Sequence, residues 1–574
     1  MADLHELNGA DRFRVNAHSR AAQVIKDLST DLSTLVGDTS ALTEIEGIGE
    51  RTAEKIIEYH ERGKVTEHED LLEQVPRGLV DVLAVPGLGP KTVRLLWKEK
   101  GITSLDDLKE ALEKGELSDV PRMGKKTIEN IRESLAFMEA GEGRTPIGIA
   151  MPIAEAMVER LAALESTNRV RYAGSLRRGQ ETIGDVDVII TTSDPAEAQE
   201  SFVSMDEVTK VLARGETKCS VRLAHESRPI QADLRIMPDE SFGAALLYFT
   251  GSKDYNIRLR EIAIGKGMTL NEYGLFEEAE SSDEPPQSRG VEPVASRTEE
   301  DVCEALGVPW RPPELRSGTD VEAEPPADLI TVEDVACELH AHTTASDGKL
   351  SIEELAECAK DRGFHTIAVT DHSQSSVIAN GLEPDRLRAH MRRVREADES
   401  VRGITILAGT EVDILPDGTL DYEDELLAEL DVVVASPHTS LRQSDSDATD
   451  RLISAIENPH VHIIGHPCGR LIKSREGLSP DIRAVSEAAA ANGVALEINA
   501  NWHRLDLRDA HVRTALEAGA LIAIDCDVHR SSGFENLRYG VLTGRRGGLP
   551  APRCVNTWGA KKLRDWLRSR RESG

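Results

Sequence analysis

The chain has 574 residues, of which 101 are Asp or Glu and 68 are Lys or Arg, so its formal net charge is −33. A chain of this length is too long for one hydrophobic core and is expected to divide into about three to five domains. No apolar run approaches the roughly 18 residues of a membrane span. Charged residues also stand where a signal peptide would be apolar. We therefore expect a cytoplasmic protein with no membrane partner.

The cysteines and the charge balance narrow the protein class further. The seven cysteines are scattered without a Cys-x-x-Cys pair, so neither a disulfide framework nor a cysteine zinc site is indicated. An acidic excess of this size opposes binding to a polyanion at low salt. It is typical of proteins from salt-loaded cytoplasms, where a Debye length of about 3 Å at 1 M salt removes long-range repulsion. We interpret the surface as that of a halophilic protein; an ordinary acidic cytosolic protein is the alternative.

Three short patterns near the N-terminus share one form, an apolar residue followed by a Gly-containing turn and an amphipathic helix. They cover residues 45–56, 85–96 and 120–131. Backbone N–H groups at such a helix start can bind a DNA phosphate without reading the base. These are helix-hairpin-helix candidates, although Arg122 replaces the first glycine of the third, and a plain helix connection is the alternative for each one. The DNA-binding glycines would be Gly47, Gly49, Gly87, Gly89 and Gly124.

Short strands replace helices from about residue 168 to 236. In the stretch Gly-Asp-Val-Asp-Val-Ile-Ile at 184–190, residues two apart point the same way, so Asp185 and Asp187 share one face. Asp233, in a second strand-like stretch, can join them if the two strands are neighbours. Three carboxylates form a hard oxygen site that suits two Mg²⁺ ions and in-line phosphoryl displacement.

A flexible loop precedes these acids. Residues 174–179 read Gly-Ser-Leu-Arg-Arg-Gly and offer a hydroxyl and guanidinium groups that can pair with phosphate oxygens. With GSLRRG, GDVDV, ADLRI and YFTGSKDYNIRLR in this order, residues 1 to about 316 resemble a family X DNA polymerase. The resemblance implies template-directed gap filling on gapped or primed duplex DNA with dNTPs.

The resemblance also implies roles for single residues. It places two catalytic Mg²⁺ on Asp185, Asp187 and Asp233. A lyase lysine that forms a Schiff base would be Lys55, which is otherwise only a solvated charge, and Arg51 stands where the family often has a neighbouring lysine. Residues expected to hold the incoming nucleotide or the nascent base pair are Gly174, Ser175, Arg178, Gly184, Tyr248, Phe249, Gly251, Asn256 and Arg260.

Apolar strands alternate with helical stretches beyond residue 333, as is typical of a β/α barrel or a doubly wound sheet. Nearly every apolar run ends in a His, Asp or Glu, and a parallel barrel assembles its active site from those ends. A single His there would most often be structural, but mixed imidazole and carboxylate ligands suit Mn²⁺, Zn²⁺ or Fe²⁺. The nine candidate ligands are His340, His342, Asp347, His372, Glu411, His438, His466, Asp527 and His529.

This arrangement resembles a PHP (polymerase and histidinol phosphatase) domain over about residues 334 to 574. The resemblance implies a distorted seven-strand barrel that holds three metals, Mn²⁺ or Zn²⁺, and hydrolyses DNA phosphoesters. The expected activities are 3′ to 5′ exonuclease, abasic-site cleavage and removal of blocked 3′ ends. It favours Asp527 over Asp525 as the ligand, and Asp371 is expected to orient His372. Further residues expected in the cleft are Glu497, Asn499 and Arg504.

The predicted fold is multidomain α+β and α/β: a helical helix-hairpin-helix N-terminal region, a nucleotidyltransferase palm with a thumb, and a C-terminal distorted (β/α)7 PHP barrel. The expected parts are a DNA-binding helical domain at 1–88, a fingers-like region at 89–143, the palm at 144–240, the thumb at 241–316, a linker at 317–333 and the barrel at 334–574. We expect a monomeric DNA repair enzyme, acting in base excision repair, from a halophilic archaeon. Two rivals stay open: a small-molecule phosphatase of the histidinol phosphate type joined to a DNA-binding half, and a DNA-binding scaffold with degenerate sites.

Overall fold

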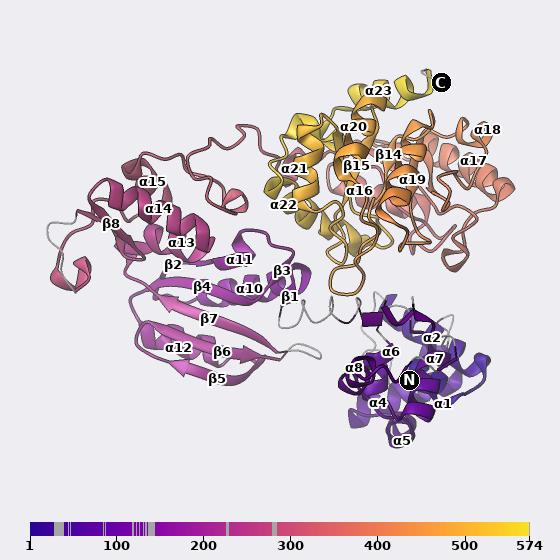
Figure 1. Cartoon of the computed structure of the whole chain (residues 1–574), viewed down its shortest axis with the longest axis horizontal. Helices are drawn as coiled ribbons and strands as arrows, with labels where there is room; N and C mark the ends of the chain where they lie inside the picture. The colour runs from indigo at the N-terminus through magenta and orange to yellow at the C-terminus, as the bar shows by residue number, and fades with distance from the viewer. Residues whose placement is uncertain are drawn as a thin grey trace. The chain divides into compact units, whose positions relative to one another are not determined.

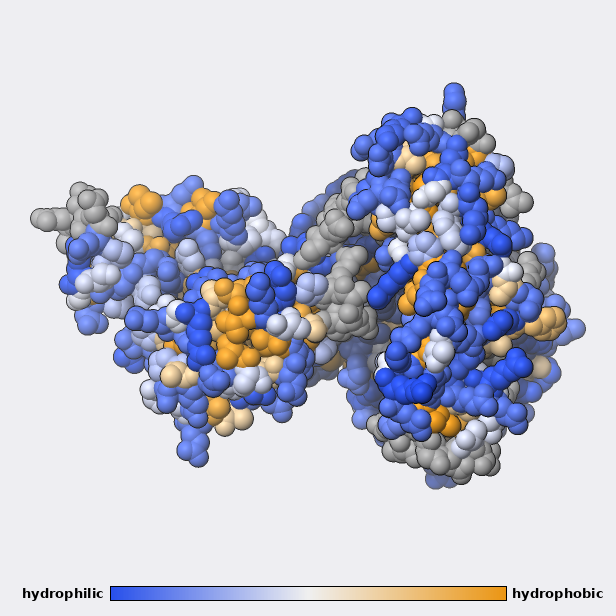
Figure 2. All heavy atoms as spheres, turned by 90° about the horizontal axis from the view of Figure 1, so that it is seen from below, coloured by the Kyte–Doolittle hydropathy of each residue, from blue (hydrophilic) through white to orange (hydrophobic). Residues whose placement is uncertain are grey.

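The computed structural model describes the chain except residues 28–38, 44, 46–47, 84, 86–87, 118–119, 122, 126, 130, 133–134, 136–143, 225–228, 278–283 and 573–574. The chain forms two compact units, residues 1–142 with 473–475, and residues 143–472 with 476–574. Figure 2 shows a largely hydrophilic surface with separate apolar patches, as the charged composition predicts. No helix in the described ranges is long and apolar enough to cross a membrane.

The first unit is helical (Figure 1). Its helices are short because glycines end them in the left-handed conformation at Gly9, Gly63 and Gly101. Leucines such as Leu79 and Leu96 form its buried core. The helices are α1 (Ala2–Asn8), α2 (Arg12–Asp27), α3 (Thr39–Thr43), α4 (Glu50–Arg62), α5 (Thr66–Gln74), α6 (Gly78–Leu83), α7 (Pro90–Lys100) and α8 (Leu105–Glu113).

The second unit begins with a five-stranded mixed sheet, the palm. Alternate residues of β4 are buried on opposite faces: Val186 and Val188 pack with α10 (Ile147–Ala162) and α12 (Pro195–Val203), and Ile189 packs with α13 (Phe242–Thr250). Its strand order is β2 (Thr167–Tyr172), β4 (Asp185–Thr192), β7 (Ile230–Ile236), β6 (Lys218–Leu223) and β5 (Val208–Arg214). Next to it lie α11 (Gly174–Arg177) and the pair β1 (Thr145–Pro146) and β3 (Thr182–Ile183).

A small helical thumb follows the palm. Its apolar core contains Leu247, Tyr255, Leu259 and Val302, which come from three helices. The elements are α13, α14 (Lys253–Gly265), the hairpin β8 (Met268–Asn271) and β9 (Gly274–Glu277), and α15 (Glu299–Leu306). Helix α13 connects the two parts, because one of its faces packs in this core and another packs on the palm sheet.

The C-terminal half is a parallel barrel, which confirms the predicted (β/α)7 fold. Seven strands pair in sequence order, and a parallel bridge between Ala341 and Val528 brings the first and last ends together. The strands are β10 (Cys337–Glu338), β11 (Thr366–Val369), β12 (Thr405–Asp413), β13 (Val432–Ser436), β14 (Ile463–Ile464), β15 (Ala495–Asn499) and β16 (Leu521–Asp525). The helices are α16 (Ile352–Asp361), α17 (Pro384–Ser400), α18 (Asp424–Leu427), α19 (Asp445–Glu457), α20 (Ile482–Asn492), α21 (Asp509–Glu517), α22 (Leu537–Arg546) and α23 (Ala560–Glu572).

Candidate active sites

The three predicted carboxylates of the palm meet on its sheet. Asp185 and Asp187 lie on β4, and Asp233 stands opposite Asp187 on β7, the parallel neighbour of β4. Each residue offers one oxygen, and these atoms lie within 4.8 Å of one another. The expectation that the two strands are neighbours is confirmed, and its consequence is a compact acidic cluster.

This cluster is electrostatically suited to a cation. Burial raises the pKa of Asp187 to about 7, and the carboxylates of Asp185 and Asp233 act in the same direction. Burial alone would raise the pKa of Asp233 as well, but a hydrogen bond from Lys218, 2.7 Å from its Oδ2, keeps that pKa below its usual value. A divalent cation between the acids would relieve the repulsion. The donor set fits Mg²⁺.

The loop that precedes the acids lies against them. Gly174 has φ +65°, and a Cβ there would come 2.5 Å from Asp187 Oδ2, so only glycine permits this approach. The Arg178 guanidinium donates to the carbonyl oxygen of Thr250, next to Gly251. Ser175 is half-buried in α11, and Gly184 directly precedes β4. The loop therefore touches the acidic cluster through Gly174, and Arg178 connects it with the end of α13.

The start of the thumb brings the other predicted nucleotide contacts together. The rings of Tyr248 and Phe249 lie 5.2 Å apart and nearly perpendicular. Asn256 donates to the carbonyl oxygen of Tyr248 at 2.6 Å. Tyr248, Asn256 and Arg260 line one small pocket. Arg235, which the sequence did not single out, lies with its guanidinium 4.3 Å from the Phe249 ring and lowers the pKa of Asp187 against the effect of burial.

All nine predicted ligands of the barrel converge beyond the C-terminal ends of its strands. Glu411, near the end of β12, is at the centre, with its two oxygens 2.8 to 3.6 Å from nitrogens of five histidines: His340, His342, His372, His438 and His466. Asp527 lies 3.1 Å from His342, and Asp347 lies 3.3 Å from His529. The cluster can be divided into several overlapping groups that could each hold a metal ion.

Several buried atoms of this cluster lie close to neighbouring ligand atoms, but within the described part of the chain none of these contacts has hydrogen-bond geometry. They include Nε2 of His340, both ring nitrogens of His342, both oxygens of Glu411 and Oδ1 of Asp527. Each unsatisfied buried polar group costs roughly 1–3 kcal/mol, and metal ions would satisfy them together. Imidazole and carboxylate donors fit Mn²⁺, Zn²⁺ or Fe²⁺.

Neighbouring carboxylates and amides hold the ligands in place. Glu497 Oε1 lies 2.6 Å from His340 Nδ1, and Oε2 accepts from the backbone N–H of His466 at 2.6 Å. Asn499 donates to Asp527 at 3.0 Å, and Arg504 lies 3.9 Å from the same carboxylate. Burial would lower the pKa of His340, but Glu411, Glu497 and Asp527 raise it well above its ordinary value. The three residues expected in the cleft thus surround the ligands.

Asp371 differs from the expectation that it orients His372. Its carboxylate accepts hydrogen bonds from the backbone N–H groups and hydroxyls of Thr343 and Ser346, and it lies 2.8 Å from His390 Nε2. It therefore fixes the loop that carries the predicted ligand Asp347. His390, which lies on α17, shows no sequence pattern that would have identified it as a partner of Asp371.

Two helix starts agree with the predicted helix-hairpin-helix motifs. α4 begins directly after Gly49 and α7 directly after Gly89, and the Ile128 N–H donates to the Gly124 carbonyl oxygen. All three glycines are exposed and a Cβ at any of them would meet nothing within 4 Å, so a phosphate could approach the backbone at these helix starts. Gly47, Gly87 and Arg122 lie outside the described residues.

Known families match the chain along most of its length. The matches are a helix-hairpin-helix domain at residues 1–65, a SAM-like helix-hairpin-helix tandem at 79–136, the DNA polymerase beta palm at 145–228, the DNA polymerase beta thumb at 245–317 and the PHP domain at 338–501. Over 565 residues the chain is 38% identical to the DNA polymerase/3′-5′ exonuclease PolX of Bacillus subtilis, covering 98% of this chain and 96% of that protein. The chain belongs to the family X DNA polymerases with a C-terminal PHP domain.

Two more distant relatives match part of the chain. DNA polymerase lambda of Rattus norvegicus is 27% identical over 333 residues, which are 55% of this chain and 54% of that polymerase. A probable phosphatase of Shewanella loihica is 30% identical over 248 residues, which are 41% of this chain and 95% of that protein. The family X resemblance predicted from the sequence motifs is confirmed.

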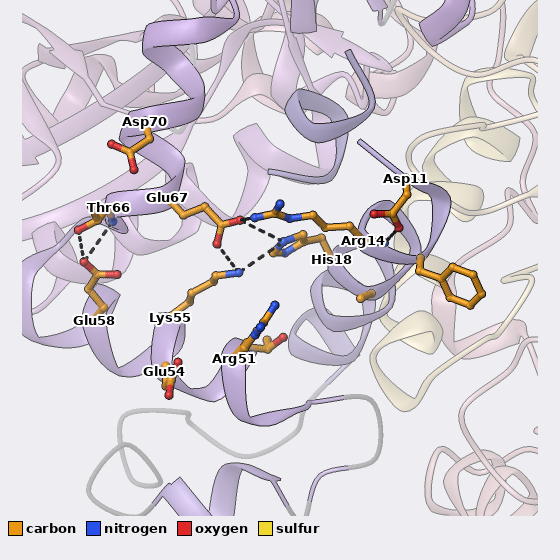
Figure 3. A pocket seen from close by; sticks show the side chains of 13 residues that line it. Asp11, Arg14, His18, Arg51, Glu54, Lys55, Glu58, Thr66, Glu67 and Asp70 are labelled. Carbon is orange, nitrogen blue, oxygen red and sulfur yellow. Dashed lines mark hydrogen bonds and ion pairs between the residues drawn. The ribbon is translucent and has the colours of Figure 1, made fainter. Parts of the chain in front are cut away.

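The lysine that family X membership marks as a candidate lyase residue lies in a pocket of the first unit. Lys55 lines a cavity of about 810 Å³, and Figure 3 shows it pointing toward Glu67 and His18. Its Nζ lies 2.5 Å from Glu67 Oε2 and 3.5 Å from His18 Nε2. Burial lowers the pKa of His18 to about 4, and Lys55 acts in the same direction. Burial alone would raise the pKa of Glu67, but hydrogen bonds from Lys55 and Arg14 lower it to about 2.

A buried ion-pair triad connects the phosphate loop with the thumb. Arg177 and Arg316 each donate to both oxygens of Glu299, at 2.7 to 3.0 Å. Glu299 is 4% exposed and Arg316 is 0% exposed. Of the two arginines in the loop, Arg177 therefore pairs with Glu299. This corrects the expectation that both guanidinium groups pair with phosphate.

Glu299→Gln should destabilise the thumb, because it leaves the buried guanidinium of Arg316 and the half-buried one of Arg177 around a neutral side chain. Breaking a buried pair in this way costs about 3–5 kcal/mol. Burial would raise the pKa of Glu299, but Arg177 and Arg316 hold it at about 2, against an ordinary 4.5. The stabilisation is thus complete above about pH 4.5 and disappears as the pH falls toward 2. Calorimetry should show that the thumb of the variant unfolds at a lower temperature than that of wild type at pH 7. The difference between the two unfolding temperatures should decrease below pH 4.5.

The exposed neighbour Glu300 supplies the matched control, since Glu300→Gln removes the same charge from the same helix. A Glu299→Gln protein that melts like the Glu300→Gln protein at pH 7 would show that the triad does not stabilise the thumb.

Proposed function

We propose that the chain repairs DNA with two metal-dependent sites. The palm extends a primer 3′-hydroxyl across a short gap, and the barrel removes nucleotides from the 3′ end. The observation that carries the proposal is the coexistence of two clusters, three carboxylates together on β4 and β7 and nine candidate ligands at the barrel's strand ends. The names of the bacterial PolX and the rat polymerase agree with it.

In the palm, Asp185, Asp187 and Asp233 would hold two Mg²⁺ ions. Bound there, the ions neutralise charge on the triphosphate and favour the ionised 3′-hydroxyl. Asp233 would lie next to that hydroxyl. The loop from Gly174 to Arg178 would orient the triphosphate through Ser175 and the Arg178 guanidinium. Further contacts, to the sugar and the nascent base pair, would come from Tyr248, Phe249, Gly251, Asn256 and Arg260.

In the barrel, the nine-residue cluster would hold three ions, Mn²⁺ or Zn²⁺. Such ions polarise a phosphoester and lower the pKa of bound water. Glu497 and Asn499 keep His340 and Asp527 in position, and Arg504 can pair with a phosphate oxygen of the DNA end. Cleavage at abasic sites and removal of blocked 3′ ends require the same chemistry, so we assign them to this cluster as well.

The acidic composition also bears on the setting in which the enzyme works. We propose that it acts as a cytoplasmic monomer at high salt, where a net charge of −33 does not repel DNA over long distances. In that setting the helix-hairpin-helix glycines would bind DNA through backbone N–H groups rather than through a basic surface.

A labelled primer on a gapped template tests the proposal. The protein is incubated in high-KCl buffer with Mg²⁺ or Mn²⁺, with and without dNTPs, and with a chelator as the control. We expect extension with dNTPs, shortening without them, and neither with the chelator. Hydrolysis of histidinol phosphate without any shortening of DNA would favour the small-molecule phosphatase. Binding without any turnover would favour the scaffold.

A lyase activity at Lys55 is a second proposed function. The observation that favours it is the cavity of about 810 Å³ that Lys55 lines, in which the amine could meet a sugar; a Schiff base forms only from the uncharged amine. Glu67 opposes this, because it occupies the Lys55 amine in an ion pair at 2.5 Å. Lys55 would therefore react once a substrate displaces Glu67.

Borohydride trapping on DNA with a 5′ abasic sugar phosphate measures this reaction. We expect a covalent adduct that Lys55→Ala abolishes and that Glu67→Gln increases, because the amine loses the ion-pair partner that occupies it. The matched control is Lys64→Ala, which removes an exposed lysine paired with Glu69. Equal trapping in the Lys55 and Lys64 variants would exclude Lys55 as the nucleophile.

A further inference from the structure

Two aliphatic side chains stand exposed on a loop of the barrel. Val377 is 80% exposed and Ile378 is 106% exposed, more than any other large apolar residue described in the barrel. They lie in the short turn Val377–Ala379, which ends at Asn380 in the left-handed conformation. Single exposed apolar residues are common. Here, however, two such residues are adjacent, and they lie at the tip of a loop next to the nine-residue cluster.

The loop that carries this pair is tightly folded. A Cβ at Gly381 would come 1.9 Å from the carbonyl oxygen of Ser373. The backbone N–H of Leu382 donates to the carbonyl oxygen of His372 at 2.8 Å, which closes the loop at its base. The hydroxyl of Ser375 donates to Asp421. A loop of fixed conformation therefore presents the apolar pair, which we call the tip, to solvent.

The same loop is attached to the metal-binding cluster. It starts at the predicted ligand His372, and the hydroxyl of Ser376 donates to Asp413 at 2.8 Å. The other oxygen of Asp413 pairs with Nδ1 of His438, another predicted ligand. Counting along the chain from the closed base, Ile378 is at most about 20 Å from His372. A DNA 3′ end that reaches the cluster would therefore lie within this distance of the tip.

We propose that Val377 and Ile378 form an apolar wedge that packs against the terminal base pair at a DNA 3′ end and helps to unpair it. The unpaired 3′ nucleotide then enters the cluster. This inference rests on the proposed 3′ to 5′ exonuclease activity. Aliphatic side chains of this kind unstack base steps in other DNA complexes. Apolar contact is also independent of charge screening, so it suits a strongly acidic protein at high salt.

The test compares Val377→Thr/Ile378→Thr with Val377→Leu/Ile378→Leu. Threonine keeps the branched shape and removes the apolar contact, and leucine keeps the contact. The substrates are a matched blunt duplex and its labelled strand alone. We expect the threonine protein to shorten the duplex on the order of 10-fold more slowly, with single-strand shortening unchanged and the leucine protein near wild type. Metal content and primer extension, measured in all three proteins, check that the fold is intact.

A second readout does not depend on exonuclease turnover. With 2-aminopurine as the 3′-terminal base of the duplex, and with a chelator present, the wild-type protein should raise the fluorescence and the threonine protein should not. An unchanged ratio of duplex to single-strand shortening, or an equal loss on both substrates, would overturn the wedge. If wild-type protein shortens neither substrate, the proposed exonuclease fails, and the fluorescence difference alone decides the wedge.

Discussion

Asp187→Asn should abolish primer extension and leave shortening of the 3′ end intact. The side chain lies between Asp185 and Asp233, and its Oδ2 faces Gly174. Asparagine has nearly the same size but is neutral, so the site would lose a charged oxygen that both metal ions need. We expect a loss of at least on the order of 1,000-fold, which corresponds to about 4 kcal/mol of activation free energy. Extension of a gapped primer with Mg²⁺ measures it.

Unfolding measured without metal separates this effect from misfolding. Burial and two neighbouring carboxylates raise the pKa of Asp187 to about 7. A carboxyl group with a raised folded-state pKa destabilises the fold as the pH rises from about 4 through about 7. Asparagine removes that effect, so the variant should be at least as stable as wild type at pH 8.

The matched control for this variant is Asp194→Asn. Asp194 caps α12 through the N–H groups of Ala196 and Glu197, and asparagine caps helices equally well. Extension within 10-fold of wild type in the Asp187→Asn protein would show that this carboxylate does not hold a catalytic metal.

The palm cluster could be predicted because its geometry follows from local periodicity. Residues two apart on a strand share a face, which fixes Asp185 and Asp187 relative to each other. Only the strand pairing that brings Asp233 to them needed the structure. The barrel cluster was predictable for a similar reason, since parallel strands deliver all their C-terminal ends to one face.

The partners of these clusters could not be predicted, because they depend on contacts between distant parts of the chain. Glu299 meets Arg177 across 122 residues, and His390 reaches Asp371 from a helix face that resembles any other buried face. Lys218 reaches Asp233 from the next antiparallel strand. Charged residues are common in this sequence, and spacing alone cannot tell which of them pair.

Glu411→Gln should abolish shortening of the 3′ end and leave primer extension unchanged. The two Glu411 oxygens face five histidines, they are buried, and they have no hydrogen-bond partner among the described residues. Burial would raise the pKa of Glu411, but the imidazoles of His438, His340 and His372 hold it well below its ordinary value. The carboxylate is thus ionised and available to bridge metal ions. Glutamine removes the charge with little change of shape.

The expected loss of shortening is on the order of 1,000-fold or more, with fewer bound metal ions per chain by atomic emission. The matched control is Glu425→Gln, which removes an exposed charge from the same barrel. Metal content provides the decisive comparison, because a variant that loses shortening but keeps all its metal would place Glu411 next to the ions rather than between them. A variant that keeps both its metal ions and its shortening of the 3′ end would mean that the nuclease site is elsewhere. The nine-residue cluster would then act on another phosphoester.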